Sequence, residues 1–428
     1  MKYKDTPFGK IPDSWELSPI SEVTELVTDY VANGSFASLA ENVTYKDEED
    51  VAVLIRLVDY NNAFKGNFVF IDEHAYEFLG KSKLFGGEII ISNVGANVGT
   101  VFRCPFLQYK MSLAPNAIMV KFKENDDFYY FWLRSHAGQH MLHSIVTGSA
   151  QPKFNKTNFR DILVPVPPRD QQDKIVSILQ PLEDKIEQNR KINENLQEQA
   201  TALFRCMFIS AEDRFSWKSG TFSDLIESTL GGDWGKESPT GNNTEMVYCI
   251  RGADIPDVKS GNKGKMPTRY ILPKNYAAKR LLPGDIVVEI SGGSPSQSTG
   301  RVAAISQSLL DRYDKGMVCT NFCRAVKPKH GYSMFVYYYW QYLYDRNVFF
   351  SYENGTTGIK NLDLSGFITT EEILLPPFEL IQKFDDYCQT VFNQTFANGL
   401  ENEKLSVLRD TLLPRLMSGE LDVSDIDL

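Results

Sequence analysis

The sequence has no apolar run near the length that a membrane-spanning helix needs. Such a helix takes about 18 consecutive apolar residues, and stretches such as Phe335–Trp340 are far shorter. The first 15 residues also lack the apolar centre of a signal peptide. We therefore expect a cytoplasmic chain with no membrane contact.

Cysteine and histidine are scarce and poorly arranged for metal binding. The six cysteines are scattered, which predicts free thiols in a reducing compartment. Of the five histidines, His136, His140 and His143 fall on one face of a predicted helix. Ala137 stands where a zinc protease has glutamate, and no fourth ligand is evident, so no metal site is expected.

Each signature of catalysis also lacks a residue that its chemistry requires. Asp285 and Glu289 have the spacing of nuclease carboxylates, but Ser291 stands where lysine is expected. Leu375 precedes Pro376-Pro377-Phe378, where an adenine methyltransferase would need a side chain that accepts a hydrogen bond from the base. No methyl-donor glycine fingerprint is present, and the glycines of residues 231–238 lack the spacing of a phosphate loop. No catalytic residue is predicted.

The net charge of −10, taken as a total, argues against a nucleic-acid partner. The charge is unevenly distributed, however, because residues 373–428 alone carry a net −6. Basic surface elsewhere in the chain is therefore compatible with the acidic total.

The chain contains an internal repeat, in which the same order of predicted elements occurs twice. Each half opens on a tryptophan segment and continues with a strand that contains an arginine, an apolar strand behind a Gly-acid turn, an aromatic helix, a polar glycine loop and a long helix. Trp15 corresponds to Trp217, and Arg56 corresponds to Arg251. This order predicts two equivalent α/β (α+β) domains with mixed sheets.

Each half ends in a long helix with one narrow apolar stripe. The first helix follows Pro168, with Pro181 expected to kink or split it, and the second ends near Pro414. Gly399, in the middle of the second helix, should cost about 1 kcal/mol relative to alanine. Two surface helices, each covering its own domain, are one interpretation. An antiparallel coiled-coil pair is the other, because the stripes are long and narrow and each holds an asparagine near its middle.

The residues expected between these helices, or against a partner, are apolar apart from the two asparagines. They are Ile175, Ile178, Leu182, Asn189, Ile192, Leu196, Leu203, Phe384, Val391, Asn398, Leu405, Leu408 and Leu412.

Three segments resemble a known family. Residues 162–179 (ILVPVPPRDQQDKIVSIL) are similar to the central conserved region of type I restriction–modification specificity subunits. Leu408–Val423 resembles their C-terminal signature, and Gly9–Glu16 resembles their opening. The resemblance covers the whole chain.

This resemblance implies two target recognition domains, each reading one half of a bipartite site in double-stranded DNA. The expected divisions are residues 1–166 and 211–376 for the domains, 167–210 and 377–416 for the helices in pseudo-twofold relation, and 417–428 for the tail. The helices would set the spacer and dock two modification (methyltransferase) subunits, through which restriction subunits join. S-adenosylmethionine, ATP and Mg²⁺ would act on those partners, with no cofactor on this chain.

Polar side chains on exposed loops are the candidates for DNA contact. In the first half they are Arg56, Tyr60, Asn61, Asn93, Asn97, Gln151, Lys153 and Asn155. In the second half they are Arg251, Ser291, Ser294, Gln297, Thr299, Arg301, Thr357, Lys360 and Asn361.

Other interpretations stay open. Arg56 and Arg251 recur in both halves, so they could equally form structural ion pairs, since two domains should read different bases. The chain could also dock partners without reading DNA, or be a methyltransferase fused to its reader.

Overall fold

The computed structural model describes residues 2–294, 297–355, 359–424 and 426. The chain divides into two compact units, residues 1–183 with 407–428 and residues 184–406. Thr357 of the predicted DNA-contacting set lies outside the described residues.

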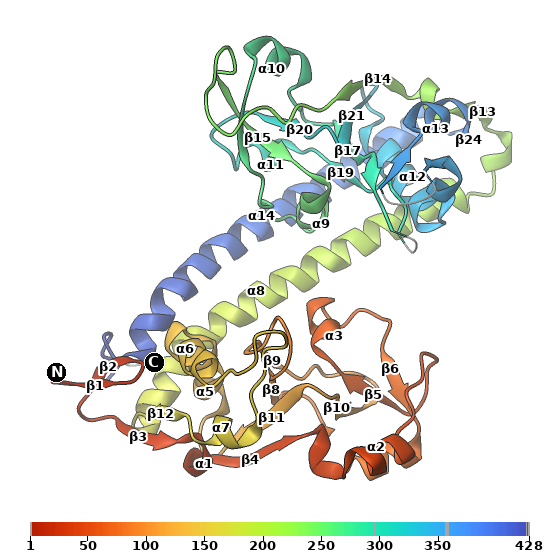
Figure 1. Cartoon of the computed structure of the whole chain (residues 1–428). Coiled ribbons are helices and arrows are strands. Elements are labelled where there is room, and N and C mark those ends of the chain that lie inside the picture. Colours follow the sequence, from red (N-terminus) through yellow and green to blue (C-terminus); the bar gives the residue numbers. More distant parts are fainter. Residues whose placement is uncertain (1, 295–296, 356–358, 425, 427–428) are drawn as a thin grey trace. The chain divides into compact units, whose positions relative to one another are not determined.

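Unit 1 is built on two four-stranded sheets (Figure 1). The first has the order β4 (Thr24–Asp29), β11 (Ala117–Phe122), β8 (Ile89–Ser92), β9 (Val101–Arg103), and the second has the order β6 (Val69–Ile71), β5 (Ala52–Ile55), β10 (Lys110–Leu113), β7 (Lys83–Leu84). Two small sheets pair β1 (Tyr3–Thr6) with β2 (Gly9–Pro12) and β3 (Glu16–Pro19) with β12 (Leu163–Val166). The helices are α1 (Ile20–Val23), α2 (Phe36–Asn42), α3 (Leu57–Asn61), α4 (Glu73–Phe78), α5 (Asp126–Arg134), α6 (His136–Ser144) and α7 (Lys156–Arg160).

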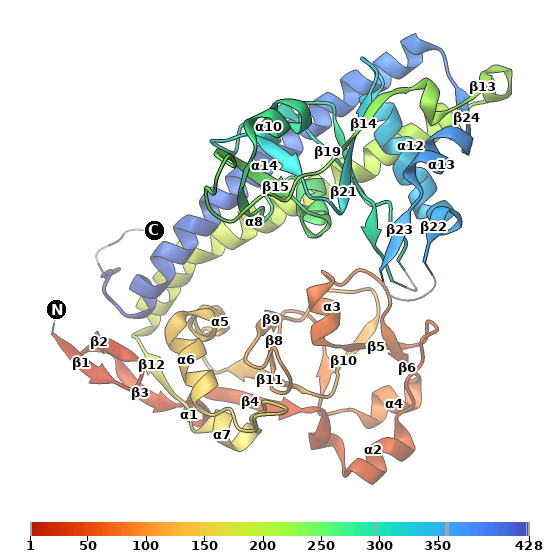
Figure 2. The same cartoon turned by 45° about the horizontal axis from the view of Figure 1, so that its top comes forward.

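Unit 2 repeats the strand order of the main sheet, whereas its second sheet has three strands instead of four. Its main sheet has the order β14 (Ile226–Gly231), β21 (Cys323–Pro328), β17 (Ile286–Glu289), β19 (Val302–Ala304), and its second sheet has the order β16 (Thr268–Ile271), β15 (Glu245–Ile250), β20 (Met317–Cys319). β13 (Lys218–Thr221) pairs with β24 (Glu372–Leu375), and β18 (Ser291–Gly292), β23 (Lys360–Leu362) and β22 (Glu353–Asn354) form a small sheet. The helices are α9 (Ile255–Lys259), α10 (Pro273–Lys279), α11 (Gln307–Leu310), α12 (Ser333–Asp345) and α13 (Leu364–Thr370), all labelled in Figure 1. Figure 2 shows α10, α12 and α13 from a second direction.

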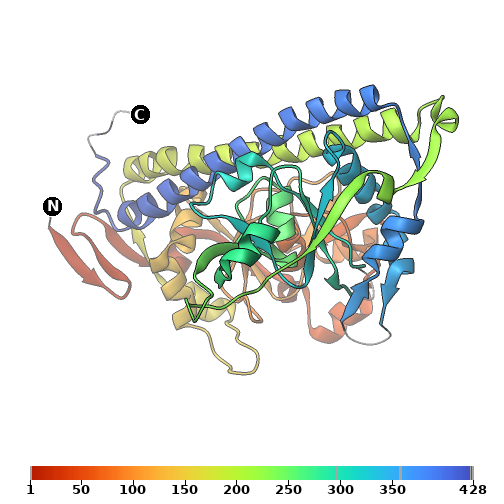
Figure 3. The ribbon, with the colours of Figure 1, turned by 90° about the horizontal axis from the view of Figure 1, so that it is seen from above.

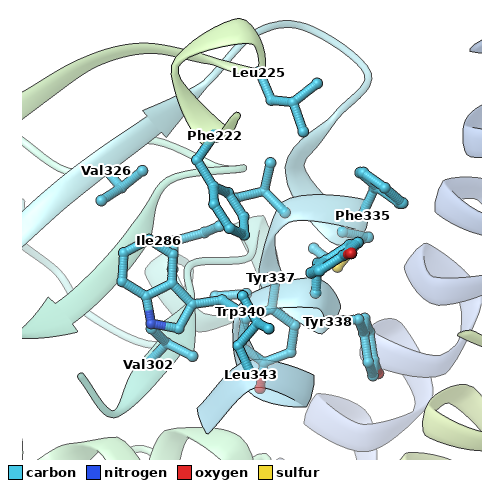
Figure 4. Packing of buried hydrophobic residues seen from close by; sticks show 14 of the residues in the cluster. Phe222, Leu225, Ile286, Val302, Val326, Phe335, Tyr337, Tyr338, Trp340 and Leu343 are labelled. Atoms are coloured by element: carbon cyan, nitrogen blue, oxygen red, sulfur yellow. The ribbon is translucent and has the colours of Figure 1, made fainter. Parts of the chain in front are cut away.

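The repeat predicted from the sequence is therefore confirmed at the level of strand order and register. In both main sheets the third strand pairs antiparallel with the second, and the second pairs antiparallel with the first. The aromatic helix of each half packs on this sheet. In unit 2 its residues Phe335 and Trp340 are fully buried against Phe222 and Val326 (Figure 4).

The two long helices, α8 (Arg169–Phe204) and α14 (Phe378–Met417), lie side by side and run antiparallel (Figure 3). Contacts within unit 2 establish the direction, because Asn189 bonds to Asn402 and Asn193 bonds to Asn398. Pro181 was expected to kink or split the first helix; the split is wrong, since α8 continues through it. Pro181 is exposed, and α8, with 36 residues, is long enough to tolerate the loss of one backbone hydrogen bond.

Two residues of the predicted stripe do not lie buried between the helices, so for them only the contact with a partner stays a prediction. Ile192 is 45% exposed and Leu408 is 46% exposed. On α8 the buried position is the neighbouring Asn193. The physical reason is that an α-helix advances 3.6 residues per turn, so a stripe drawn with a fixed 3–4 spacing drifts off the contact line.

Within the described part of the chain, no helix is long and apolar enough to cross a membrane.

Candidate nucleic-acid interface

In unit 1 the fold joins two of the three predicted DNA-contacting regions. Val94, in the loop after β8, pairs with Lys153, in the loop before α7. The Gly95 N–H donates to the Pro152 carbonyl over 2.9 Å, and the Asn93 side chain donates to the Phe154 carbonyl over 3.0 Å. The two loops thus form one polar surface at the end of the main sheet.

The remaining predicted residues of these loops are presented to solvent. Asn97, Gln151 and Lys153 are exposed. Asn155 is exposed as well, but its side chain caps α7 by accepting from the Asn158 N–H. Its role is therefore at least partly structural.

Unit 2 joins the equivalent loops. Ser291 and Asn361 are register partners in the small β18–β23 sheet, and the Ser291 hydroxyl donates to the Asn361 side-chain oxygen over 2.6 Å. In the same loop, Ser294 pairs with Gln297. The same two loops therefore meet in both repeats, with different side chains in each.

A helix anchors the far end of the first loop in each unit. In unit 1 the Gln139 amide of α6 donates to the Gly99 carbonyl over 3.0 Å. In unit 2 the Trp340 indole of α12 donates to the Gly300 carbonyl over 2.9 Å. Both glycines have positive φ, which an L side chain rarely adopts. The loops are thus held by the scaffold at both ends.

Several predicted contact residues of unit 2 are already bound to carboxylates of the same unit. Thr299 is fully buried and its hydroxyl donates to Glu353, which argues against direct base contact. The Lys360 ammonium also pairs with Glu353, over 2.7 Å. Arg301 makes a two-pronged contact with Glu289, with both distances 2.7 Å. Sequence reasoning missed Glu353, because nothing nearby in the chain signals its burial.

Ion pairs also account for Asp285 and Glu289, the two carboxylates with nuclease-like spacing. Glu289 holds Arg301, while Asp285 accepts from Lys327 over 2.7 Å. Both carboxylates are thereby used in structural ion pairs on a plain strand. Among the described residues, no three His, Cys, Asp or Glu side chains are grouped so that they could hold a metal ion.

The third predicted region is organised differently, around an arginine that begins a short helical turn. Arg56 binds Asp59 through Nε at 3.0 Å and Nη2 at 2.6 Å, and it also donates to the Asn67 carbonyl. The hydrogen bond to Asp59 raises the pKa of the guanidinium. The Tyr60 ring stacks on Phe102 with centroids 4.7 Å apart, and Asn61 is exposed.

Arg251 repeats the Arg56 geometry in unit 2. It binds Asp254 through Nε at 2.9 Å and donates to the Lys265 carbonyl. Asp59 and Asp254 are each only 2% exposed. The ion-pair interpretation therefore describes both arginines, with the carboxylate rather than the guanidinium buried. A DNA contact by either arginine stays a prediction.

The helix pair holds four buried asparagines in unit 2. Asn193 Oδ1 accepts from Asn398 over 2.8 Å, and Asn189 donates to Asn402 over 2.9 Å. Two of the four, Asn189 and Asn398, were predicted. The other two could have been found from the four-residue spacing that places each beside a predicted asparagine on its own helix.

Comparison with known proteins shows what the chain is similar to. Residues 12–198 match the model of the type I restriction modification DNA specificity domain. The MjaIX type I restriction enzyme specificity subunit of Methanocaldococcus jannaschii is 23% identical over 99% of this chain and 98% of its own length. The chain is thus similar to type I specificity subunits over nearly its whole length.

One more relative and one solved structure show the same similarity. The HindI specificity subunit of Haemophilus influenzae is 22% identical over 63% of this chain and 71% of its own length. The crystal structure of a type I S subunit from M. genitalium has the same fold, with a TM-score of 0.54 at 14% identity. That likeness covers 96% of this chain and 98% of the other, so it includes both repeats.

Proposed function

We propose that this chain is the DNA sequence-recognition subunit of a type I restriction–modification complex, with each unit reading one half of a bipartite asymmetric site. One observation carries the proposal. The two units share strand order and register, yet the joined loops carry Asn97, Gln151 and Lys153 in one and Ser291 and Asn361 in the other. An equivalent scaffold with different polar loops is what two different half-sites require.

We assign the long helices to the spacer and to partner docking. α8 has 36 residues, so it is about 54 Å long at 1.5 Å per residue. That length corresponds to about 16 base pairs of duplex at 3.4 Å each. Exposed apolar side chains such as Ile192 and Leu400 on the helices support docking of two modification subunits, through which restriction subunits would join.

We also propose that the chain is not itself an enzyme. Its carboxylates with nuclease-like spacing are neutralised by arginine and lysine partners. S-adenosylmethionine, ATP and Mg²⁺ would be held by the modification and restriction subunits. Assembly would take place in the cytoplasm, where the DNA is.

Methylome sequencing tests the proposal directly. Cells that carry the modification subunit with the intact chain should show adenine methylation at one bipartite motif, and cells with a truncated chain should show none. A motif that is the same with and without this chain would mean that it only docks partners. Binding of labelled methyl donor by the isolated chain would instead indicate a fused methyltransferase.

Loop variants test whether each unit reads its own half of the motif. Asn97→Ala with Gln151→Ala in unit 1 should relax one half of the motif and leave the other half unchanged. The matched unit 2 variant, Ser291→Ala with Asn361→Ala, should relax the opposite half. Changes to both halves by either variant would contradict the division of labour.

A further inference from the structure

A cleft of about 520 Å³ opens in unit 2 beside the joined loops. Arg324 of β21 lines it together with Ser228 and Thr229 of the edge strand β14. Ile290 and Leu362 line it from the other side, and the Leu362 N–H donates to the Ile290 carbonyl over 2.8 Å. Each of these two residues directly adjoins a predicted DNA-contacting residue, Ser291 or Asn361.

Arg324 is the uncommitted cation of this cleft. It is exposed, and within the described part of the chain it makes no ion pair and donates no side-chain hydrogen bond. The other arginines near the loops, Arg251 and Arg301, are each held by a carboxylate. Glu227 also lines the cleft but forms no ion pair with Arg324 among the described residues.

A glycine makes room for this side chain. Gly231 is the register partner of Arg324, and a Cβ added at Gly231 would lie 2.6 Å from an Arg324 Nη1 atom. Any other residue at position 231 would therefore displace the guanidinium from its present place.

The first repeat has a different pair at the same register. In unit 2, Arg324 of β21 pairs with Val288 of β17 and with Gly231 of β14. In unit 1, Ile118 of β11 holds the equivalent position, because it pairs with Ile91 of β8 and with Asp29 of β4. Ile118 is fully buried in the core of unit 1. Asp29 in turn caps the 3₁₀ turn Tyr30–Asn33 and pairs with Lys156 over 2.8 Å. The scaffold thus supports an apolar residue at this position, and unit 2 departs from it by placing a free guanidinium there.

We propose that Arg324 is a DNA phosphate contact specific to unit 2, with the Ser228 and Thr229 hydroxyls as neighbouring donors. This proposal rests on the proposed DNA-reading function. A guanidinium with five donors suits phosphate oxygens, and backbone contacts hold a reader in register while loop residues meet base edges. Divergence between repeats at one register position points to a role outside the shared scaffold.

The test uses the full chain in complex with its modification subunit and a duplex that carries the motif found by methylome sequencing. Binding is measured at several salt concentrations for the intact chain, Arg324→Ala and Arg324→Lys. Arg280→Ala is the charge-matched control, because Arg280 is exposed at the C-terminal end of α10, away from the cleft residues.

Arg324→Ala should weaken binding about tenfold, with a salt dependence shallower by about one ion released. Arg324→Lys should recover part of the affinity, and Arg280→Ala should change neither quantity. Melting temperatures should be unchanged, since Arg324 donates no hydrogen bond in the described structure. In duplexes with single methylphosphonate linkages, one position in the unit 2 half-site should weaken the intact chain and have no effect on Arg324→Ala.

Two results would overturn the proposal, and a third would overturn the proposed function. If Arg324→Ala relaxes the motif at one base pair while every methylphosphonate acts equally on both proteins, Arg324 reads a base edge instead. If Arg324→Ala binds DNA like the intact chain, the cleft makes no DNA contact. If the intact complex shows no preference for any duplex, the proposed function itself is wrong.

Discussion

Asn193 and Asn398 face each other in the interior of the antiparallel helix pair, joined by a hydrogen bond of 2.8 Å. Asn193 also donates to the carbonyls of Ser260 and Thr395, so it ties α8 both to α14 and to the loop after α9. A polar contact at this depth specifies which residues of the two helices lie opposite each other, because a shifted register would leave the amides unpaired.

Asn398→Leu should lower the stability of unit 2 by about 1–3 kcal/mol, because it leaves the buried Asn193 oxygen without a donor. Urea denaturation followed by circular dichroism measures the loss. The double variant with Asn193→Leu should be less destabilised than the sum of the single variants. Additive losses would show that the two asparagines act independently.

Arg56→Ala should destabilise unit 1 by about 1–3 kcal/mol, since it removes the charged partner of the buried Asp59 carboxylate. Arg251→Ala should do the same in unit 2 through Asp254. Thermal melting and binding to the motif duplex at low temperature are measured together. Unchanged melting with weakened binding would instead make these arginines DNA contacts.

Gly399→Ala should destabilise the protein although alanine is the better helix former by about 1 kcal/mol. A Cβ at Gly399 would lie 1.9 Å from the carbonyl oxygen of Gly261, so the loop would have to move away. The melting temperature of the full chain shows whether the variant is less or more stable than the intact chain. A rise in the melting temperature would show that the loop yields at no cost.

Lys153→Ala should weaken binding to every DNA sequence and reduce the salt dependence, as expected for a phosphate contact on an exposed loop. Titrations with motif and non-motif duplexes at several salt concentrations measure both effects. Binding that does not change would count against the loop as a DNA surface.

Cys206 should be the one thiol that reacts rapidly with iodoacetamide at pH 8 in the folded chain. It is exposed, whereas the other five cysteines are buried. Burial raises the pKa of Cys249 to about 12 and that of Cys323 to about 11, so their thiolate forms are rare at that pH. Mass spectrometry should find one label on the folded chain and six after unfolding, and early labelling of Cys249 would contradict the buried core.

The predicted residues of the loops after β8 and β17 differ in what the fold does with them. Asn97 and Gln297 are exposed as expected. Thr299 and Arg301 are held by Glu353 and Glu289, which lie 54 and 12 residues away in the chain. A polar side chain on a loop looks the same in sequence whether it meets solvent or a distant carboxylate, so this distinction could not be predicted.

The sequence by itself determined the duplicated α/β plan, the two long helices, the equivalence of Arg56 and Arg251, and the resemblance to type I specificity subunits. These features are encoded in local order and periodicity, which survive without knowledge of distant contacts. Only the tertiary structure decided which asparagines meet between the helices, that Ile192 and Leu408 stay exposed, and that Arg324 has no ion-pair partner among the described residues. Those outcomes depend on register between strands and helices far apart in the chain. A shift of one residue changes which side chains are paired and which remain open to a partner.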